Sequence, residues 1–207
     1  PPATIFTLLQ DIISRFNALY PQITLSVHEL EAGRLFASLA QDATAVGITT
    51  LFFDQSALPP KVAQYKDQLL TKLLFTDRIV AFLSKKHPLA RQKSISLSSI
   101  LKHPLALYLV GELQDNMIYH LLKIYGQPQI VFTSQNIAVY IRHIAQGQCI
   151  GFSSNAVFEQ HQFYDKSELT TLPVRGNTEF ATSLTVHKDF QSTPASEKFI
   201  AFIQEQF

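Results

Sequence analysis

A strand–turn–helix–strand unit between Gln129 and Ser154 is the feature that most constrains the fold of this sequence. It reads QIVF, TSQN, IAVYIRHIAQGQ and CIGFSS in succession. The apolar residues of the third segment recur at the spacing of one helix face, at Ile137, Ile141 and Ile144. Gly147 then stops the helix, and the flanking apolar runs predict two short buried strands.

The TSQN turn, Thr133 to Asn136, therefore lies where a strand ends and a helix begins. Free backbone N–H groups and the positive end of the helix dipole favour anions at such a position. The turn offers hydroxyls and amides but no catalytic acid or base. We predict that it holds a small ligand without changing it.

The composition is that of an ordinary folded domain, with 46% hydrophobic and 16% charged residues in a chain of 207. This length suits one large domain or two small ones. The net charge of +1 gives no basic footprint for nucleic acid, so DNA binding would need another part of the protein. Because the chain starts Pro1-Pro2 and runs at once into a helix, we expect an excised domain, with a processed mature protein as the alternative.

Cysteine and histidine usage argues against disulfides and metals. The single Cys149 excludes an internal disulfide and fits a reducing compartment. The seven histidines show no HxxxH or HxH pairing, so no metal site is predicted. No apolar run approaches the ~20 residues of a membrane span, and no signal peptide is recognised. We expect a cytoplasmic location and no cofactor.

Predicted strands and helices alternate along the chain, which indicates an α/β fold with largely parallel sheets. Helices are predicted near 5–19, 33–41, 96–102, 112–125, 137–145 and from Thr193-Pro194 onward. Strands are predicted at 23–27, 45–48, 69–75, 78–83, 104–108, 130–132, 149–152, 169–172 and 180–186. Residues 51–68 and 155–167 look irregular. In such folds the ligand crevice lies beyond the carboxyl ends of the strands.

Polar residues follow several predicted strands, and Thr4 opens the first helix. They are Thr49 and Thr50, Thr133 to Asn136, and Ser153 with Ser154, while Gly111 follows the strand at 104–108. Each hydroxyl could simply cap its own helix, at ~1 kcal/mol apiece. The set as a whole favours a ligand site, because α/β topology brings several such ends to one crevice.

Four segments, in this order, resemble the effector-binding domain of LysR-type transcriptional regulators. They are LLQDIISRFNALYPQITLSVHE (8–29), LFASLAQDATAVGIT (35–49), LLFTDRIVAFLSKKHPLA (73–90) and IVFTSQNIAVYIRHIAQGQCIGFSSNAVFE (130–159). The resemblance covers nearly the whole chain, and the order and spacing of the motifs are more specific than any single motif. Ala45 stands where the family usually has an acidic residue, and Gln148-Cys149 departs from its Gly-rich turn.

The resemblance implies two lobes like those of type 2 periplasmic binding proteins, each a mixed, mostly parallel sheet flanked by helices. Lobe I would comprise residues 1–76 plus 178–207, and lobe II residues 77–177. The chain would cross near Thr76-Asp77 and again near Arg175-Gly176-Asn177. The resemblance also implies a first strand before Pro1 and, further upstream, a winged helix-turn-helix that binds DNA.

By the same resemblance, the effector lies between the lobes. Lobe I would offer Thr4, the loop around Glu31, and Thr49-Thr50; lobe II would offer Gly111, Thr133, Ser134, Gln135 and Ser153. Family effectors are small metabolites, often carboxylates, and binding shifts the angle between lobes. The expected partners are this effector and a second copy of the domain, within a tetramer of the full-length protein. DNA would bind only through the missing N-terminal domain, and no membrane is involved.

Other functions share parts of this pattern. A secreted solute-binding protein of a transporter would have the same fold, so the upstream sequence decides between the two. An enzyme would need acid and base groups that converge in the cleft, where only Glu31, Asp54 and Asp115 are candidates. We interpret His143 and Cys149 as a solvated histidine and a buried cysteine rather than a nucleophilic pair, and Glu29 and Glu31 as solvated carboxylates.

Overall fold

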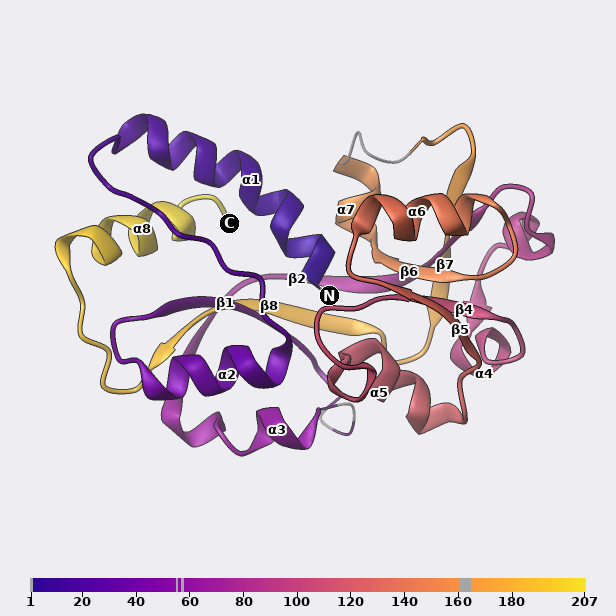
Figure 1. Ribbon diagram of the computed structural model, residues 1–207, viewed down its shortest axis with the longest axis horizontal. Helices are drawn as coiled ribbons and strands as arrows, with labels where there is room; N and C mark the ends of the chain where they lie inside the picture. The colour runs from indigo at the N-terminus through magenta and orange to yellow at the C-terminus, as the bar shows by residue number, and fades with distance from the viewer. Residues whose placement is uncertain (1, 55, 57, 161–164) are drawn as a thin grey trace.

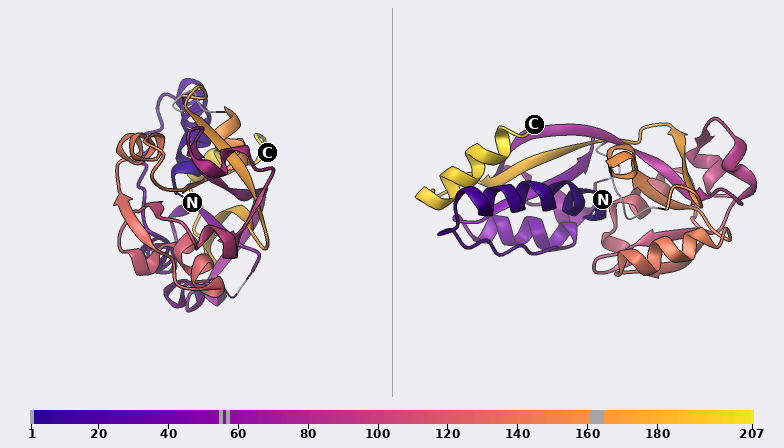
Figure 2. Two further views of the ribbon diagram at one scale, coloured as in Figure 1. Left: turned by 90° about the vertical axis from the view of Figure 1, so that its right-hand side faces the viewer. Right: turned by 90° about the horizontal axis from the view of Figure 1, so that it is seen from above.

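The computed structural model describes residues 2–54, 56, 58–160 and 165–207, with side chains from Leu9 onward except at 157, 159 and 160. The chain forms two halves side by side, joined by long strands (Figures 1 and 2). Its helices are α1 (Pro2–Leu19), α2 (Ala32–Gln41), α3 (Pro60–Ala63), α4 (Leu97–Ile100), α5 (Met117–Tyr125), α6 (Ile137–Ala145), α7 (Asn155–Gln160) and α8 (Pro194–Gln204). Its strands are β1 (Val46–Phe52), β2 (Leu69–Ser84), β3 (Ile95–Ser96), β4 (Leu105–Tyr108), β5 (Ile130–Ser134), β6 (Gly151–Ser154), β7 (Leu169–Arg175) and β8 (Glu179–His187).

One long strand, β2, runs through both halves. Its first part, Leu69–Arg78, pairs with β8, and its last part, Val80–Ser84, pairs with β7. The six-stranded sheet has the order β1-β8-β2-β7-β3, with β6 added to β2. The pair β4–β5 lies beside it and is joined to it by a bridge between Leu105 and Ile150.

The strand pairing corrects the expectation of mostly parallel sheets. Strand β2 is antiparallel to β6, β7 and β8, and β1 is antiparallel to β8. Only β3–β7 and β4–β5 are parallel pairs of named strands. The reason is the path of the chain, which passes from the first half to the second along β2 and returns along β7 and β8. Two passes that run side by side in opposite directions are antiparallel, and hydrophobic periodicity does not reveal this.

Each half has helices on both faces of its strands (Figure 1). In the first half, α1 and α8 enclose a cluster of Ile12, Phe16, Leu184, Phe202 and Ile203, and α2 and α3 enclose a cluster of Phe36, Leu39, Val62 and Leu69. In the second half, β2 sends Phe82 to one cluster and Ile79, Ala81 and Leu83 to the other. This alternation follows from the period of two in a strand. Each fully buried side chain of this size stabilises the fold by ~1.5–3 kcal/mol.

Most predicted elements are confirmed, although the ends of α1, α5, β1 and β7 differ by three to five residues. Helix α8 begins as expected at Pro194, where Thr193 and Ser196 form a reciprocal cap. Four predictions are wrong. The two strands expected at 69–75 and 78–83 are one strand, and residues 23–27 form no strand. Residues 155–160 are helical, and the segment 51–68, expected to be irregular, contains α3 and the end of β1.

Candidate functional site

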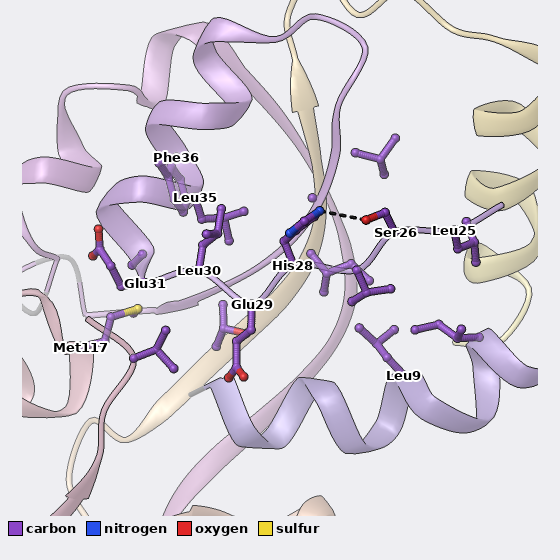
Figure 3. A pocket seen from close by; sticks show the side chains of 18 of the residues that line it. Leu9, Leu25, Ser26, His28, Glu29, Leu30, Glu31, Leu35, Phe36 and Met117 are labelled. Carbon is purple, nitrogen blue, oxygen red and sulfur yellow. Dashed lines mark hydrogen bonds between the residues drawn. The ribbon is translucent and has the colours of Figure 1, made fainter. Parts of the chain in front are cut away.

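A cavity of about 470 Å³ lies between the two halves. The first half contributes residues of α1, α2, β1, α8 and the extended segment from Ile23 to Glu31. The second half contributes Tyr108, Val110, Asn116, Met117, Ile118, Ile137, Tyr140 and Ser153. Figure 3 shows Glu31 and Met117 on one side of the cavity and Leu9 and Leu25 on the other.

The cavity has two chemically different ends. The interlobe end is defined by Thr50, Glu29, Tyr108, Asn116 and Ser153, where polar groups from both halves meet. The apolar end is enclosed by α1, α8, α2 and β1 and is defined by Leu9, Ile13, Leu25, Phe36, Val46, Ile48 and Phe199. At the interlobe end a small polar ligand can make hydrogen bonds to both halves at once; further polar side chains of the first half, among them Ser26, His28 and Ser196, also line the cavity.

Glu29 and Tyr108 link the two halves at this end. The Tyr108 hydroxyl lies 3.3 Å and 3.5 Å from the two carboxylate oxygens of Glu29 and donates a long hydrogen bond. Loss of hydration beside the protein raises the pKa of Glu29, and the bond from Tyr108 opposes this rise only in part. Burial together with the negative charge of Glu29 raises the pKa of Tyr108 to about 12. Each group therefore holds its proton up to a higher pH than it would in water.

Asn116 positions Tyr108 from within the second half. Its side-chain amide donates to the Tyr108 carbonyl at 3.1 Å, while its amide oxygen accepts from the Tyr119 N–H at 3.0 Å. This second bond caps the start of α5. The strand end of β4 and the helix start of α5 are thereby held together at the cavity wall.

Glu31 is buried at the start of α2, with 7% of its surface exposed. Its carboxylate accepts from the Gly33 and Arg34 N–H groups at 2.9 and 2.6 Å, so it caps the helix. Gly111 of the second half packs directly against it. A Cβ on Gly111 would lie 2.8 Å from the Glu31 Cγ, and its φ of +82° also favours glycine.

Lys61 and Asp115 form an ion pair next to the contact between Glu31 and Gly111. The Lys61 ammonium of α3 lies 2.8 Å from the Asp115 carboxylate, which is itself buried. Both residues line a smaller hollow of about 240 Å³, together with Glu31, Gly111 and Glu112. Because Lys61 is 60% exposed, we expect this pair to add little stability.

The structure brings only some of the predicted site residues to the cavity. Glu31, Thr50 and Ser153 line it, and Gly111 lines the smaller hollow beside it. Thr49 belongs to β1 but bonds to Thr185 at 2.7 Å between the hydroxyl oxygens, on the other face of the strand. Thr4 lies in the first turns of α1, and its side chain is outside the described residues.

The predicted TSQN contacts lie elsewhere. Thr133, Ser134 and Gln135 are not among the residues that line the cavity, although Ile137 and Tyr140 of the following helix are. The Ser134 hydroxyl donates to the Asn136 carbonyl and accepts from its N–H, both at 3.0 Å. Asn136 in turn caps α6. In this structure the side chains of Ser134 and Asn136 thus bond within the turn and to its own helix.

The comparisons with known proteins agree on one family. The sequence model of the LysR substrate binding domain matches residues 1–207. The chain belongs to this family. This LysR substrate-binding domain is 25% identical over 153 residues to the HTH-type transcriptional regulator CysB of Haemophilus influenzae, covering 72% of the chain and 43% of CysB. The chain thus spans less than half the length of that curated relative.

Solved structures show the same fold. The CcmR regulatory domain of Synechocystis PCC6803, in complex with 2-PG, superposes with a TM-score of 0.75 at 14% identity, covering 97% of this chain and 91% of that one. The effector binding domain of QuiR, in complex with shikimate, has a TM-score of 0.68 at 14% identity, with coverage of 96% and 89%. The predicted two-lobed fold like that of type 2 periplasmic binding proteins is confirmed, and the family is one of binding domains rather than enzymes.

Sequence reasoning missed the residues of the second half that shape the interlobe end. Tyr108, Asn116 and Tyr140 were not singled out. Of the two carboxylates interpreted as solvated, Glu29 is exposed as expected, whereas Glu31 is buried as the cap of α2. A signal existed for Tyr108, because it ends a strand of this LysR substrate-binding domain, where the crevice rule looks for ligand contacts. Tyr140 links α6 to β6, since its hydroxyl accepts from the Phe152 N–H at 2.6 Å and donates to the Phe152 carbonyl at 3.0 Å.

The alternative chemistries find little support in this domain. Cys149 is fully buried, and burial raises its pKa to about 11, so the thiol stays protonated and weakly nucleophilic. The His143 ring stacks on Phe132 at 3.9 Å between centroids. Within the part of the chain that the structure describes, no group of three or more metal-ligating residues occurs. No helix there is long and apolar enough to cross a membrane.

Proposed function

We propose that this domain senses a small molecule for a LysR-type transcriptional regulator, by binding it at the interlobe end of the cavity. The observation that carries the proposal is a cavity of about 470 Å³ with polar walls from both halves. A ligand there contacts both halves at once. It therefore stabilises one angle between them over others, and this is how a binding event becomes a conformational signal.

The proposal divides the chain into lobe I, residues 1–76 plus 178–207, and lobe II, residues 77–177. Strand β2 passes through the first boundary, and the segment between β7 and β8 forms the second. In the whole protein we propose dimers of this domain within a tetramer, a cytoplasmic location and DNA binding through a separate N-terminal domain. The similarity to CysB, an HTH-type transcriptional regulator more than twice as long as the matched segment, supports this over a transporter component.

The charges of the side chains that line the cavity limit the kinds of ligand that it can bind. Its carboxylates are Glu29, Glu31 and Asp115, and no Lys or Arg is among the residues found to line the cavity. Glu31 and Asp115 already accept hydrogen bonds from the protein, whereas from the described residues Glu29 receives the long bond from Tyr108 alone. The carboxylate-type metabolite that we propose would lie beside Thr50 and Ser153. A hydroxyl or amino group of the same metabolite would face Glu29.

A panel of small carboxylates, screened by thermal shift, tests this function. A ligand present at 100 times its dissociation constant adds ~2.7 kcal/mol to the free energy of unfolding. We expect hydroxy- and amino-carboxylates to raise the melting temperature, and the same acids without a hydrogen-bond donor to raise it less.

Glu29→Gln provides the control for the ligand class. It keeps the shape of the side chain and removes the negative charge, so affinity for a plain carboxylate should rise while preference for an amino group should fall. A panel in which no compound stabilises the domain, or in which Glu29→Gln leaves every preference unchanged, argues against this ligand class.

A further inference from the structure

Residues 78–111 contain basic side chains and no acidic one. Over the whole chain the two kinds are almost equal, with 17 basic and 16 acidic residues. The small net charge of +1 is therefore an average over regions of different charge. The Lys and Arg residues of this segment are Arg78, Lys85, Lys86, Arg91, Lys93 and Lys102.

Most of this segment folds at the outer end of the second half. Residues 84–103 include the end of β2, the short 3-10 helix Pro88–Arg91, β3 and α4. They lie at the end of the second half that is farthest from α8 (Figures 1 and 2). The rings of His87 and His103 are 5.8 Å apart between centroids, so the two turns that hold these histidines lie side by side. The basic residues are thus gathered at one end of the molecule.

Four of these cations are exposed and form no ion pair with a described carboxylate. We call them the basic tip, which consists of Lys86, Arg91, Lys93 and Lys102. The other two have acidic neighbours. Arg78 lies 2.6 Å from the Glu179 carboxylate, and the Lys85 N–H donates to the carbonyl of Glu168 at 2.8 Å. A cluster of cations without nearby carboxylates attracts anions from solution.

The surface around the basic tip lacks the apolar anchors that a protein partner needs. None of the exposed large apolar side chains of the described residues lies in 84–103, where Ile95, Leu97 and Ile100 are buried. The centre of a protein–protein interface is apolar, and its binding energy comes mainly from aromatic and Arg anchors in pockets. Contacts to nucleic-acid phosphates need Lys and Arg but no apolar area. The chemistry of the tip therefore favours a phosphate backbone.

We propose that the basic tip binds the phosphate backbone of double-stranded DNA, whatever its sequence. This contact adds to the separate DNA-binding domain proposed above. Each cation that meets a phosphate releases a counterion, so four contacts give a slope of about −3.6 for log affinity against log salt concentration. Because the tip belongs to the second half, a change in the angle between the halves would move it relative to the duplex. That last step rests on the sensing function proposed above, whereas DNA binding by the tip does not.

Fluorescence anisotropy of a labelled duplex, titrated with the chain of residues 1–207, tests the proposal. We expect binding at about 20 mM salt that is lost by about 200 mM, with the slope of about −3.6. A triple variant, Lys86→Gln with Lys93→Gln and Lys102→Gln, leaves one cation of the tip and should reduce the slope to about −0.9. A melting temperature within about 2 °C of the parent's shows that the variant is folded.

A matched control removes the same charge from the first half. It combines Lys72→Gln, Lys188→Gln and Lys198→Gln, at three exposed lysines, and should keep the slope near about −3.6. An equal loss of slope in the two triple variants would overturn the proposal, because affinity would then follow the net charge of the chain. Absence of binding at about 20 mM salt would overturn it as well.

Poly-glutamate as a competitor distinguishes DNA from an acidic protein segment. Duplex DNA has one charge per ~1.7 Å of its axis, whereas an extended polypeptide has one per ~3.3 Å. At equal charge concentration we expect poly-glutamate to displace the duplex about tenfold less effectively. Equal or better displacement would mean that the tip fits an acidic protein, and the proposal would be wrong. Ligand affinity is measured without DNA, so failure here leaves the sensing function standing.

Discussion

The Tyr108 hydroxyl of one half donates to the Glu29 carboxylate of the other, at 3.3 Å from one of its oxygens. This is a direct polar link between the two halves at the edge of the ligand cavity. The bond is long, and the carboxylate remains open to solvent. A ligand that bonds to either group would compete with this link and could alter the angle between the halves.

The partial burial of Glu29 and Tyr108 makes stability depend on pH in two ranges. The pKa of Glu29 is raised above its ordinary 4.5, so the folded state binds more protons than the unfolded state just above that pH. The free energy of unfolding therefore falls as the pH rises through this window. For Tyr108 the same reasoning places a fall between pH 10.0 and about 12. Glu29→Gln should flatten the first fall and Tyr108→Phe the second, in denaturant titrations across pH. Unchanged slopes in both variants would contradict the raised pKa values of Glu29 and Tyr108.

Gly111 should control how closely the halves approach. Gly111→Ala adds a Cβ 2.8 Å from the Glu31 Cγ at a φ of +82°, whereas Gly147 has the same φ but its nearest contact would be at 3.6 Å. Gly147→Ala should cost ~1 kcal/mol from backbone strain alone. Gly111→Ala should cost ~1–3 kcal/mol more, because Glu31 must move. Urea unfolding of both variants measures the difference, and equal costs would mean that the Gly111–Glu31 contact is not tight.

We expect the Tyr140 hydroxyl to contribute measurably to the free energy of unfolding. It bonds to both backbone groups of Phe152 within the buried core. Tyr140→Phe leaves a buried N–H and C=O without these partners, so we expect a loss of ~1–3 kcal/mol in the free energy of unfolding. Tyr125→Phe, at a residue 36% exposed, is the matched control and should cost under ~0.5 kcal/mol. A loss for Tyr140→Phe no larger than the control would contradict the assigned role.

Local sequence patterns predicted many of the helices and strands. Periodicity and caps located α1, α6 and α8, because these depend on neighbouring residues. Pairing direction and the single long β2 were not predictable from them, since both depend on which segments meet across the sheet. The extended segment 23–27 was recognised by alternation, but alternation cannot supply a pairing partner.

The candidate site was predictable only in part, for a related reason. Thr50 and Ser153 were predicted from the crevice rule, because each follows or ends a strand at the junction, whereas Glu31 was predicted from the family resemblance. Thr133, Ser134 and Gln135 satisfy the same local rule, yet their strand β5 lies outside the main sheet, beside β4. Glu29 and Tyr108 gain their importance from contact across the halves, and a local pattern contains no information on that contact.

The affinity of a confirmed ligand for Ser153→Ala and Ser134→Ala tests the interlobe site most directly. Both substitutions remove one hydroxyl, but only Ser153 lines the cavity. Isothermal titration should show a five- to tenfold loss for Ser153→Ala, which corresponds to ~1–1.5 kcal/mol for one hydrogen bond, and less than a twofold change for Ser134→Ala. The opposite order, with Ser134→Ala weakening the ligand and Ser153→Ala leaving it unchanged, would contradict the proposed site and move it to the turn before α6.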